Sequence, residues 1–233
     1  MTELDVLYFD LCYSLGLIGA PLLEVGSGKV HGSGVPNVVD LARSRGIQGA
    51  IGADVRPGEG VGIVQDFTLR PEGFSRVWGR GKFATVVCFN LLEHTFDPVA
   101  VLINALSCCE SGGTLVVTAP AVWPLHDFPR DYLRLMPHWY EEFGRRTGLV
   151  LEERVFCWLS SLGIARVGEL LRDGQYELPT YRNMGREREP VRYWSSRVVQ
   201  RLFNTFGRTH FATHAAIGAA YRVPAPTMEK TEL

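Results

Sequence analysis

The stretch that most constrains the fold is Leu22 to Gly28, an apolar segment with one acid that runs straight into Gly-Ser-Gly. Leucine and valine around Glu24 predict a short buried strand. Glycines let the backbone turn sharply and leave no Cβ in the way of a ligand. A strand, a glycine turn and then a helix is how open α/β sheets form a crevice for a nucleotide. Because Gly-x-Gly also occurs in ordinary turns, this interpretation depends on the residues farther along the chain.

The composition is that of a globular chain without a dominant charge. Its 233 residues suffice for one α/β domain with a full core, and 46% are hydrophobic against 21% charged. A net charge of −1 gives no general attraction to nucleic acid or anionic membranes. The first twenty residues are acidic and lack the basic start of a secretory signal, and the chain has no apolar run long enough to span a membrane. We therefore expect a cytoplasmic protein that does not contact membranes.

The cysteines predict neither a disulfide framework nor a zinc site. Their number is odd and no two have C-x-x-C spacing. We expect no metal site on this evidence. The five cysteines are Cys12, Cys88, Cys108, Cys109 and Cys157.

Strands and helices alternate through the first half of the chain. This alternation predicts a parallel, doubly wound sheet. The segment 82–89 is apolar on both faces, as a central parallel strand should be, and Pro120 is expected to end the fifth strand. The predicted strands are 21–25, 49–54, 62–67, 82–89 and 114–119, and the predicted helices are 3–18, 35–45 and 99–109.

The pattern changes after residue 120, where a loop rich in Pro, Trp, His and Tyr begins. We expect one domain over 1–223, with an insertion at about 158–210 that caps the sheet and offers a homodimer face. A polar tail, 224–233, is expected to be disordered. The elements predicted here are helices at 137–146, 158–172 and 193–206 and strands at 149–156 and 211–223.

Polar side chains follow four of the predicted strands, where an open α/β sheet binds its ligand. Asp54 can accept hydrogen bonds from both hydroxyls of a ribose. Asp66 offers an acceptor for an adenine amino group, beside the apolar ring of Phe67. Acids outnumber bases around this crevice, which indicates a nucleoside with a cationic end. The glycines are not followed by the lysine of a P-loop, so triphosphate binding is not expected.

Together these segments resemble the successive motifs of class I S-adenosylmethionine-dependent methyltransferases. The resemblance runs over about 20–156 and rests on Glu24–Gly28, Asp54, Asp66–Phe67, Asn90–His94 and Ser111–Leu115. It implies a Rossmann-like α/β fold: a seven-stranded, mostly parallel sheet of order 3-2-1-4-5-7-6, an antiparallel last strand and helices on both faces. The run Pro120–Pro137 further resembles a bacterial subgroup with a methyltransferase-type-11-like core. The glycine loop departs from the family at Val30 and is lengthened by 31–34.

The resemblance also implies roles for individual residues. Gly26 and Gly28 let the backbone approach the methionine moiety, and Glu24 orients that loop. Asp54 holds the ribose, while Asp66 receives the adenine amino group. The implied cofactor is S-adenosyl-L-methionine, which leaves as S-adenosyl-L-homocysteine. Its expected contacts are Glu24, Gly26, Ser27, Gly28, Asp54, Val55, Asp66, Phe67, Asn90, Leu91 and His94.

Methyl transfer from a sulfonium is a single in-line displacement, since the methyl group is already activated. Holding the acceptor atom about 3 Å from the methyl group can supply much of the rate. A base is needed only for a poorly acidic acceptor, and His126 and Asp127 are the candidates. The predicted acceptor is a small molecule that contacts Trp123, His126, Tyr132 and Arg134.

Three other functions remain open on the sequence. A dinucleotide-dependent oxidoreductase needs a third glycine where His31 stands. A non-catalytic methyltransferase-like binding module would not need the acids at 24, 54 and 66. RNA methylation through the arginine-rich segment 182–201 is opposed by Glu187, Glu189 and the slightly acidic chain, which favour a solvated lid or dimer face. Nucleic acid is therefore not the expected partner.

Overall fold

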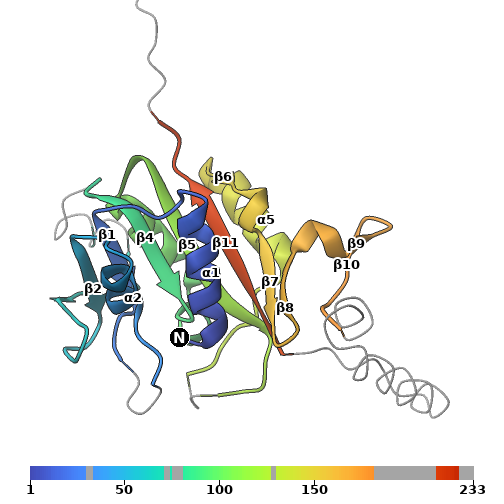
Figure 1. Ribbon diagram of the computed structural model, residues 1–233, viewed down its shortest axis with the longest axis horizontal. Helices are drawn as coiled ribbons and strands as arrows, with labels where there is room; N and C mark the ends of the chain where they lie inside the picture. Colours follow the sequence, from blue (N-terminus) through green and yellow to red (C-terminus); the bar gives the residue numbers. More distant parts are fainter. Residues whose placement is uncertain (30–33, 71–73, 75–80, 127–129, 181–213, 226–233) are drawn as a thin grey trace, which may run out of the picture.

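The computed structural model describes residues 1–29, 34–70, 74, 81–126, 130–180 and 214–225 (Figure 1). Several predictions lie outside these residues. They are the candidate base Asp127, the lengthened glycine loop at 31–33, the arginine-rich segment 182–201, the helix at 193–206 and most of the C-terminal tail.

Within the described residues, nine strands form one sheet in the order β3-β2-β1-β4-β5-β11-β7-β8, with β6 also paired to β11. Strands β1 to β5 pair in parallel, and β11 runs antiparallel to β5 and β7. This confirms the predicted order of the first five strands and the antiparallel last strand. The strands are β1 (Leu22–Val25), β2 (Ala50–Asp54), β3 (Ile63–Val64), β4 (Phe83–Phe89), β5 (Cys109–Val122), β6 (Val150–Leu151), β7 (Cys157–Ser160), β8 (Gly163–Arg166) and β11 (Ala215–Arg222).

The predicted helix at 158–172 is wrong. A β-hairpin, β7–β8, occupies its first part and is followed by the 3₁₀ helix η3 (Val167–Leu170) and the small pair β9 (Leu171–Arg172) and β10 (Gln175–Tyr176). Gly163 takes a positive φ of 115° at the hairpin turn, a conformation that favours glycine. The predicted strand 149–156 is also replaced, by β6, the 3₁₀ helix η2 (Glu153–Val155) and β7. The sheet thus has more strands than the seven expected.

Pro120 does not end the fifth strand, which continues to Val122. Pro120 pairs with Ala216, and the register shifts between Ala215 and Ala216. A bulge is one of the few places where a strand accepts proline, because the missing N–H is not needed there. The extra residues carry β5 past the end of β4, whose last residue pairs with Thr118, while β11 still pairs with Val122.

Helices cover both faces of the sheet, as predicted. The helices α1 (Glu3–Ser14) and α2 (Val38–Ser44) pack on one face, and α4 (Pro98–Cys108) and α5 (Pro137–Thr147) on the other. Successive residues of β4 serve the two faces in turn: Val86 and Cys88 belong to the core under α4 and α5, Val87 and Phe89 to the core under α1 and α2. No helix in the described residues is long and apolar enough to cross a membrane.

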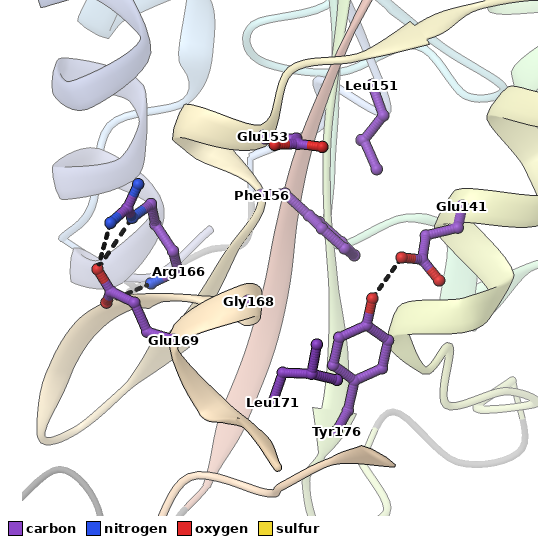
Figure 2. Close-up of a pocket in the computed structure, with 9 residues that line it drawn as sticks. All are labelled: Glu141, Leu151, Glu153, Phe156, Arg166, Gly168, Glu169, Leu171 and Tyr176. Atoms are coloured by element: carbon purple, nitrogen blue, oxygen red, sulfur yellow. Dashed lines mark hydrogen bonds and ion pairs between the residues drawn. The ribbon is translucent and has the colours of Figure 1, made fainter. Parts of the chain in front are cut away.

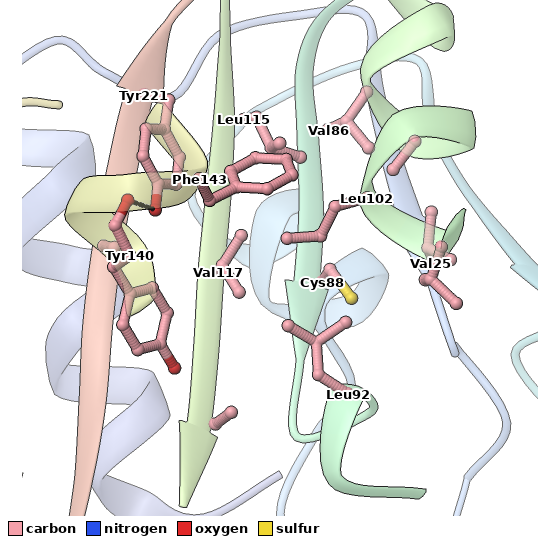
Figure 3. Packing of buried hydrophobic residues seen from close by; sticks show 14 of the residues in the cluster. Val25, Val86, Cys88, Leu92, Leu102, Leu115, Val117, Tyr140, Phe143 and Tyr221 are labelled. Atoms are coloured by element: carbon pink, nitrogen blue, oxygen red, sulfur yellow. Dashed lines mark hydrogen bonds between the residues drawn. The ribbon is translucent and has the colours of Figure 1, made fainter. Parts of the chain in front are cut away.

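The core under α4 and α5 is aromatic on the side of β11 (Figure 3). Phe143 packs edge-on against Tyr221, with ring centroids 5.6 Å apart. The buried Tyr221 hydroxyl donates to the Tyr140 carbonyl over 2.8 Å. This bond ties α5 to the last strand and leaves α5 fixed against the sheet.

Helix α1 lies against β11 through a glycine that no other residue can replace without a clash. A Cβ on Gly218 would lie 2.5 to 2.8 Å from atoms of the buried Tyr8 ring. We expect G218A to lower the free energy of unfolding by about 1–3 kcal/mol, the usual cost of overpacking a core. Urea unfolding checks this, with G168A as the control because a Cβ on Gly168 meets nothing within 4 Å. Equal midpoints for the two variants would contradict the packing argument.

Candidate functional site

A cavity of about 320 Å³ lies at the edge of the sheet where the parallel strands end. Chain segments that follow β1, β4 and β5 meet there, together with the first turn of α1. Its volume suits a small molecule. The lining residues are Met1, Thr2, Leu4, Gly28, Asn90, Glu93, His94, Pro120, Trp123, His126 and Ala216.

The glycine turn packs as the sequence predicts. Gly26 has a φ of 83°, and a Cβ there would lie 3.1 Å from the Leu91 side chain. The Gly28 N–H donates to the Asp54 carboxylate over 3.1 Å, and a Cβ on Gly28 would lie 3.0 Å from the same oxygen. Asp54 also accepts from the Arg56 N–H over 3.1 Å. The predicted ribose acceptor is therefore held directly beside the turn.

Glu24 is buried and connects β1 to the helix after the glycine loop. Its carboxylate accepts the Val39 N–H, in the first turn of α2, over 3.0 Å. Burial raises the pKa of Glu24 to about 7, and backbone N–H groups from the same helix start oppose that shift. Both ends of the loop are thus fixed by one side chain, consistent with the orienting role that the sequence suggests.

Ser27 and Phe67 lie on the core side of the site. Ser27 is fully buried, and a Cβ on Gly52 would approach its Oγ to 2.4 Å. Phe67 packs against Phe74 with ring centroids 4.8 Å apart. Both side chains thus pack beneath the site, and their predicted contacts with the cofactor stay predictions.

Val55 and Asp66 lie farther along the same edge. Val55 is exposed at the end of β2. One oxygen of Asp66 accepts the N–H and the hydroxyl of Thr68, over 2.7 and 2.6 Å. Asp66 thus closes a tight turn after β3, and its predicted contact with an adenine amino group stays a prediction.

Asp5 is a site residue that no sequence motif marked. Its buried carboxylate accepts from Asn90 Nδ2 over 2.6 Å and from the Thr118 hydroxyl over 2.8 Å. It also closes the capping box of α1 with Thr2. Asn90 has a φ of 46°, unusual for a residue other than glycine. The start of α1 is therefore tied to the ends of β4 and β5, and the T-x-x-D spacing of the capping box was the available signal.

Glu93, His94 and His126 face one another in the cavity wall. Glu93 Oε1 lies 3.7 Å from His94 Nε2 and 3.9 Å from His126 Nε2. The two imidazole rings meet edge-on with centroids 4.9 Å apart. Glu93 is 1% exposed, and neither of its oxygens has a hydrogen-bond partner in the described residues. Burial raises the pKa of Glu93 to about 8.

Arg134 holds the loop after β5 together. Its guanidinium donates to the carbonyls of Trp123, Pro124 and Leu133 and pairs with both oxygens of Asp131. These bonds engage all five of its N–H groups, so Arg134 has a structural role here, and its predicted contact with the substrate stays a prediction. Its charge holds the pKa of Asp131 well below the usual range.

Trp123 lines the cavity, with its ring 5.3 Å from that of His214. Tyr132 is half exposed and packs edge-on against Phe96 outside the cavity lining. Of the four predicted acceptor contacts, Trp123 and His126 thus meet at the cavity.

A second cavity, of about 610 Å³, lies between α5, η3 and β10, away from the glycine turn (Figure 2). Two of its three carboxylates have partners within the described residues: Glu169 pairs with Arg166, and Glu141 accepts from the Tyr176 hydroxyl. Although it is the larger cavity, none of the predicted site residues lines it.

The sequence is similar to curated bacterial methyltransferases. It is 26% identical over 157 residues to a ubiquinone biosynthesis O-methyltransferase of Xanthomonas euvesicatoria pv. vesicatoria, covering 64% of this chain and 58% of that protein. The protein of the same name from Xanthomonas campestris pv. campestris is 27% identical over 136 residues, covering 55% and 52%. The match thus spans between half and three fifths of these relatives. No family model matches the chain.

Solved structures of methyltransferases match nearly the whole chain. A putative methyltransferase from Bacillus halodurans superposes with a TM-score of 0.51 and 14% identity, covering 94% of this chain and 99% of that one. A SAM-dependent methyltransferase from Archaeoglobus fulgidus gives 0.50 and 15%, covering 94% of each. The chain has the class I SAM-dependent methyltransferase fold.

The methyltransferase fold accounts for where the site lies. In an open α/β sheet the ligand binds outside the carboxyl ends of the strands. The described cofactor candidates Gly28, Asn90 and His94 line one cavity there. Glu24 and Asp54 support the turn from behind. Sequence reasoning missed Asp5, which holds Asn90 and which only the capping-box spacing marks. It also missed part of the cavity lining, namely Met1, Thr2, Leu4, Pro120 and Ala216.

Proposed function

We propose that this chain transfers the methyl group of S-adenosylmethionine to a hydroxyl oxygen of a small molecule. The observation that carries the proposal is the cavity that joins Gly28, Asn90 and His94, on the predicted cofactor side, to Trp123 and His126, on the predicted acceptor side. In-line transfer needs donor and acceptor to meet in one enclosed space. A volume of about 320 Å³ favours a small acceptor over a macromolecule.

Oxygen is the proposed acceptor atom for two reasons. The curated relatives are named as O-methyltransferases. The cavity wall also offers a carboxylate and two imidazoles, groups that help remove a hydroxyl proton. Asp54 holds the ribose and the glycine turn approaches the methionine end.

A turnover assay with methyl-labelled S-adenosylmethionine tests this function. The full chain is incubated with a panel of simple phenols and catechols and, separately, with total RNA. We expect labelled ether products and S-adenosylhomocysteine only with the small hydroxyl compounds. Label in RNA alone would favour the nucleic-acid alternative. Cofactor binding without turnover, in a small-molecule extract as well, would favour a non-catalytic module.

A further inference from the structure

Both histidines in the cavity wall turn the same ring nitrogen toward Glu93. His94 Nδ1 lies 2.8 Å from the Arg130 carbonyl, which can only accept, so this nitrogen carries the hydrogen. His126 Nδ1 lies 3.4 Å from the Pro124 carbonyl, which can only accept, and 3.2 Å from the Asp131 carboxylate, so this nitrogen carries the hydrogen as well. In a neutral imidazole the lone pair then lies on Nε2, the atom nearest Glu93 in each ring.

Three lone-pair donors therefore point at a common space. The donor atoms of the three side chains all lie within 4.8 Å of one another. At 3.7 and 3.9 Å the carboxylate is too far from either Nε2 for a hydrogen bond. Two metal–ligand bonds of about 2.1 Å that share one ion span up to roughly 4.2 Å. This span accommodates the distances from Glu93 Oε1 to the Nε2 atoms of His94 and His126. The buried and unpartnered Glu93 carboxylate independently indicates a missing cation.

We propose that Glu93, His94 and His126 together bind one divalent transition-metal ion in the wall of the cavity. Two imidazoles and one carboxylate suit zinc or iron better than magnesium or calcium. The Arg130 and Pro124 carbonyls supply the outer hydrogen bonds that orient ligating histidines, and the Asp131 carboxylate lies beside the His126 ring. Three protein ligands leave a coordination position open on the cavity side.

The open position gives the metal a role in the proposed methyl transfer, on which this part of the inference rests. A hydroxyl bound to the metal loses its proton to water more readily. Its oxygen then forms the new O–CH₃ bond as the S–CH₃ bond breaks. The bonding electrons go to sulfur, so the sulfonium becomes the neutral thioether of S-adenosylhomocysteine. His126 serves as a metal ligand in this account, which replaces the general base predicted from the sequence.

Metal binding is measured directly with Co²⁺, whose visible absorption reports its coordination, on chelator-treated full chain. We expect one Co²⁺ per chain, displaced by Zn²⁺, and at least tenfold weaker binding in E93Q, H94N and H126N. H138N is the matched control, because His138 is exposed on α5 and pairs with Glu141. Circular dichroism shows which variants fold. If E93Q does not fold, the loss of Co²⁺ binding in H126N is the test of the metal site.

Two results would overturn the metal site: no saturable binding in the wild-type chain, or binding that H126N and H138N weaken equally. Calorimetry with S-adenosylhomocysteine on the same preparations separates the two proposals. Cofactor binding without metal binding removes the metal site and leaves the methyltransferase function. Metal binding without cofactor binding removes the methyltransferase function and leaves the metal site.

Discussion

We expect D54N to weaken the binding of S-adenosylhomocysteine about tenfold to a hundredfold. A hydrogen bond to a charged group contributes about 1.5–3 kcal/mol, and the variant keeps the shape of the side chain while removing its charge. Asp54 is held beside the glycine turn by the Gly28 and Arg56 N–H groups, so little rearrangement is needed to receive a ribose. Titration calorimetry measures the affinity.

The control for D54N is D10N, which removes the same charge from a surface pair with Arg45. D10N should bind the product with wild-type affinity. If D54N and D10N bind equally well, Asp54 does not hold the ribose, and the cofactor lies elsewhere along the edge.

The second large effect concerns Glu24 and pH. Its pKa is raised to about 7 from an ordinary value of 4.5, so the folded chain binds this proton more tightly than the unfolded chain. The free energy of unfolding that Glu24 contributes therefore falls as pH rises from about 4.5 to 7 and is constant above that. The shift corresponds to a loss on the order of 3 kcal/mol.

Denaturant unfolding across this pH range, with wild type and E24Q compared at each pH, measures the effect. The amide of E24Q can still accept the Val39 N–H but cannot ionise, so the stability advantage of the wild type should shrink as pH rises. E110Q changes an exposed carboxyl on β5, and its free energy of unfolding should depend on pH in the same way as that of the wild type. A constant difference between wild type and E24Q would show that burial does not perturb Glu24.

The first five strands were predictable because each signal is local. The apolar segment 82–89 is the central strand β4, and Asp54 ends β2 as expected. The positions of Gly26 and Gly28 also followed from the sequence, since glycine there has a steric cause: a Cβ would meet Leu91 or Asp54. The residues that form a turn and the apolar residues of a buried strand are neighbours in the sequence, so a local pattern reveals them.

The features that were not predictable depend on contacts between distant segments. The region 158–172 carries an apolar run that a helix or a hairpin can bury, and pairing of β7 with β11 decides for the hairpin. Asp5 is separated from Thr118 by 113 positions, so no local pattern marks the bond between them. The expectation of no metal site rested on cysteine spacing alone, whereas the donor set that we propose joins Glu93 and His94 to a distant histidine, His126.

The central claim is that the edge of this sheet binds S-adenosylmethionine. Titration calorimetry of the full chain with S-adenosylhomocysteine and with NAD⁺ tests it most directly. We predict saturable binding of S-adenosylhomocysteine at one site per chain and no binding of NAD⁺ under the same conditions. Binding of NAD⁺ without binding of S-adenosylhomocysteine would contradict the account.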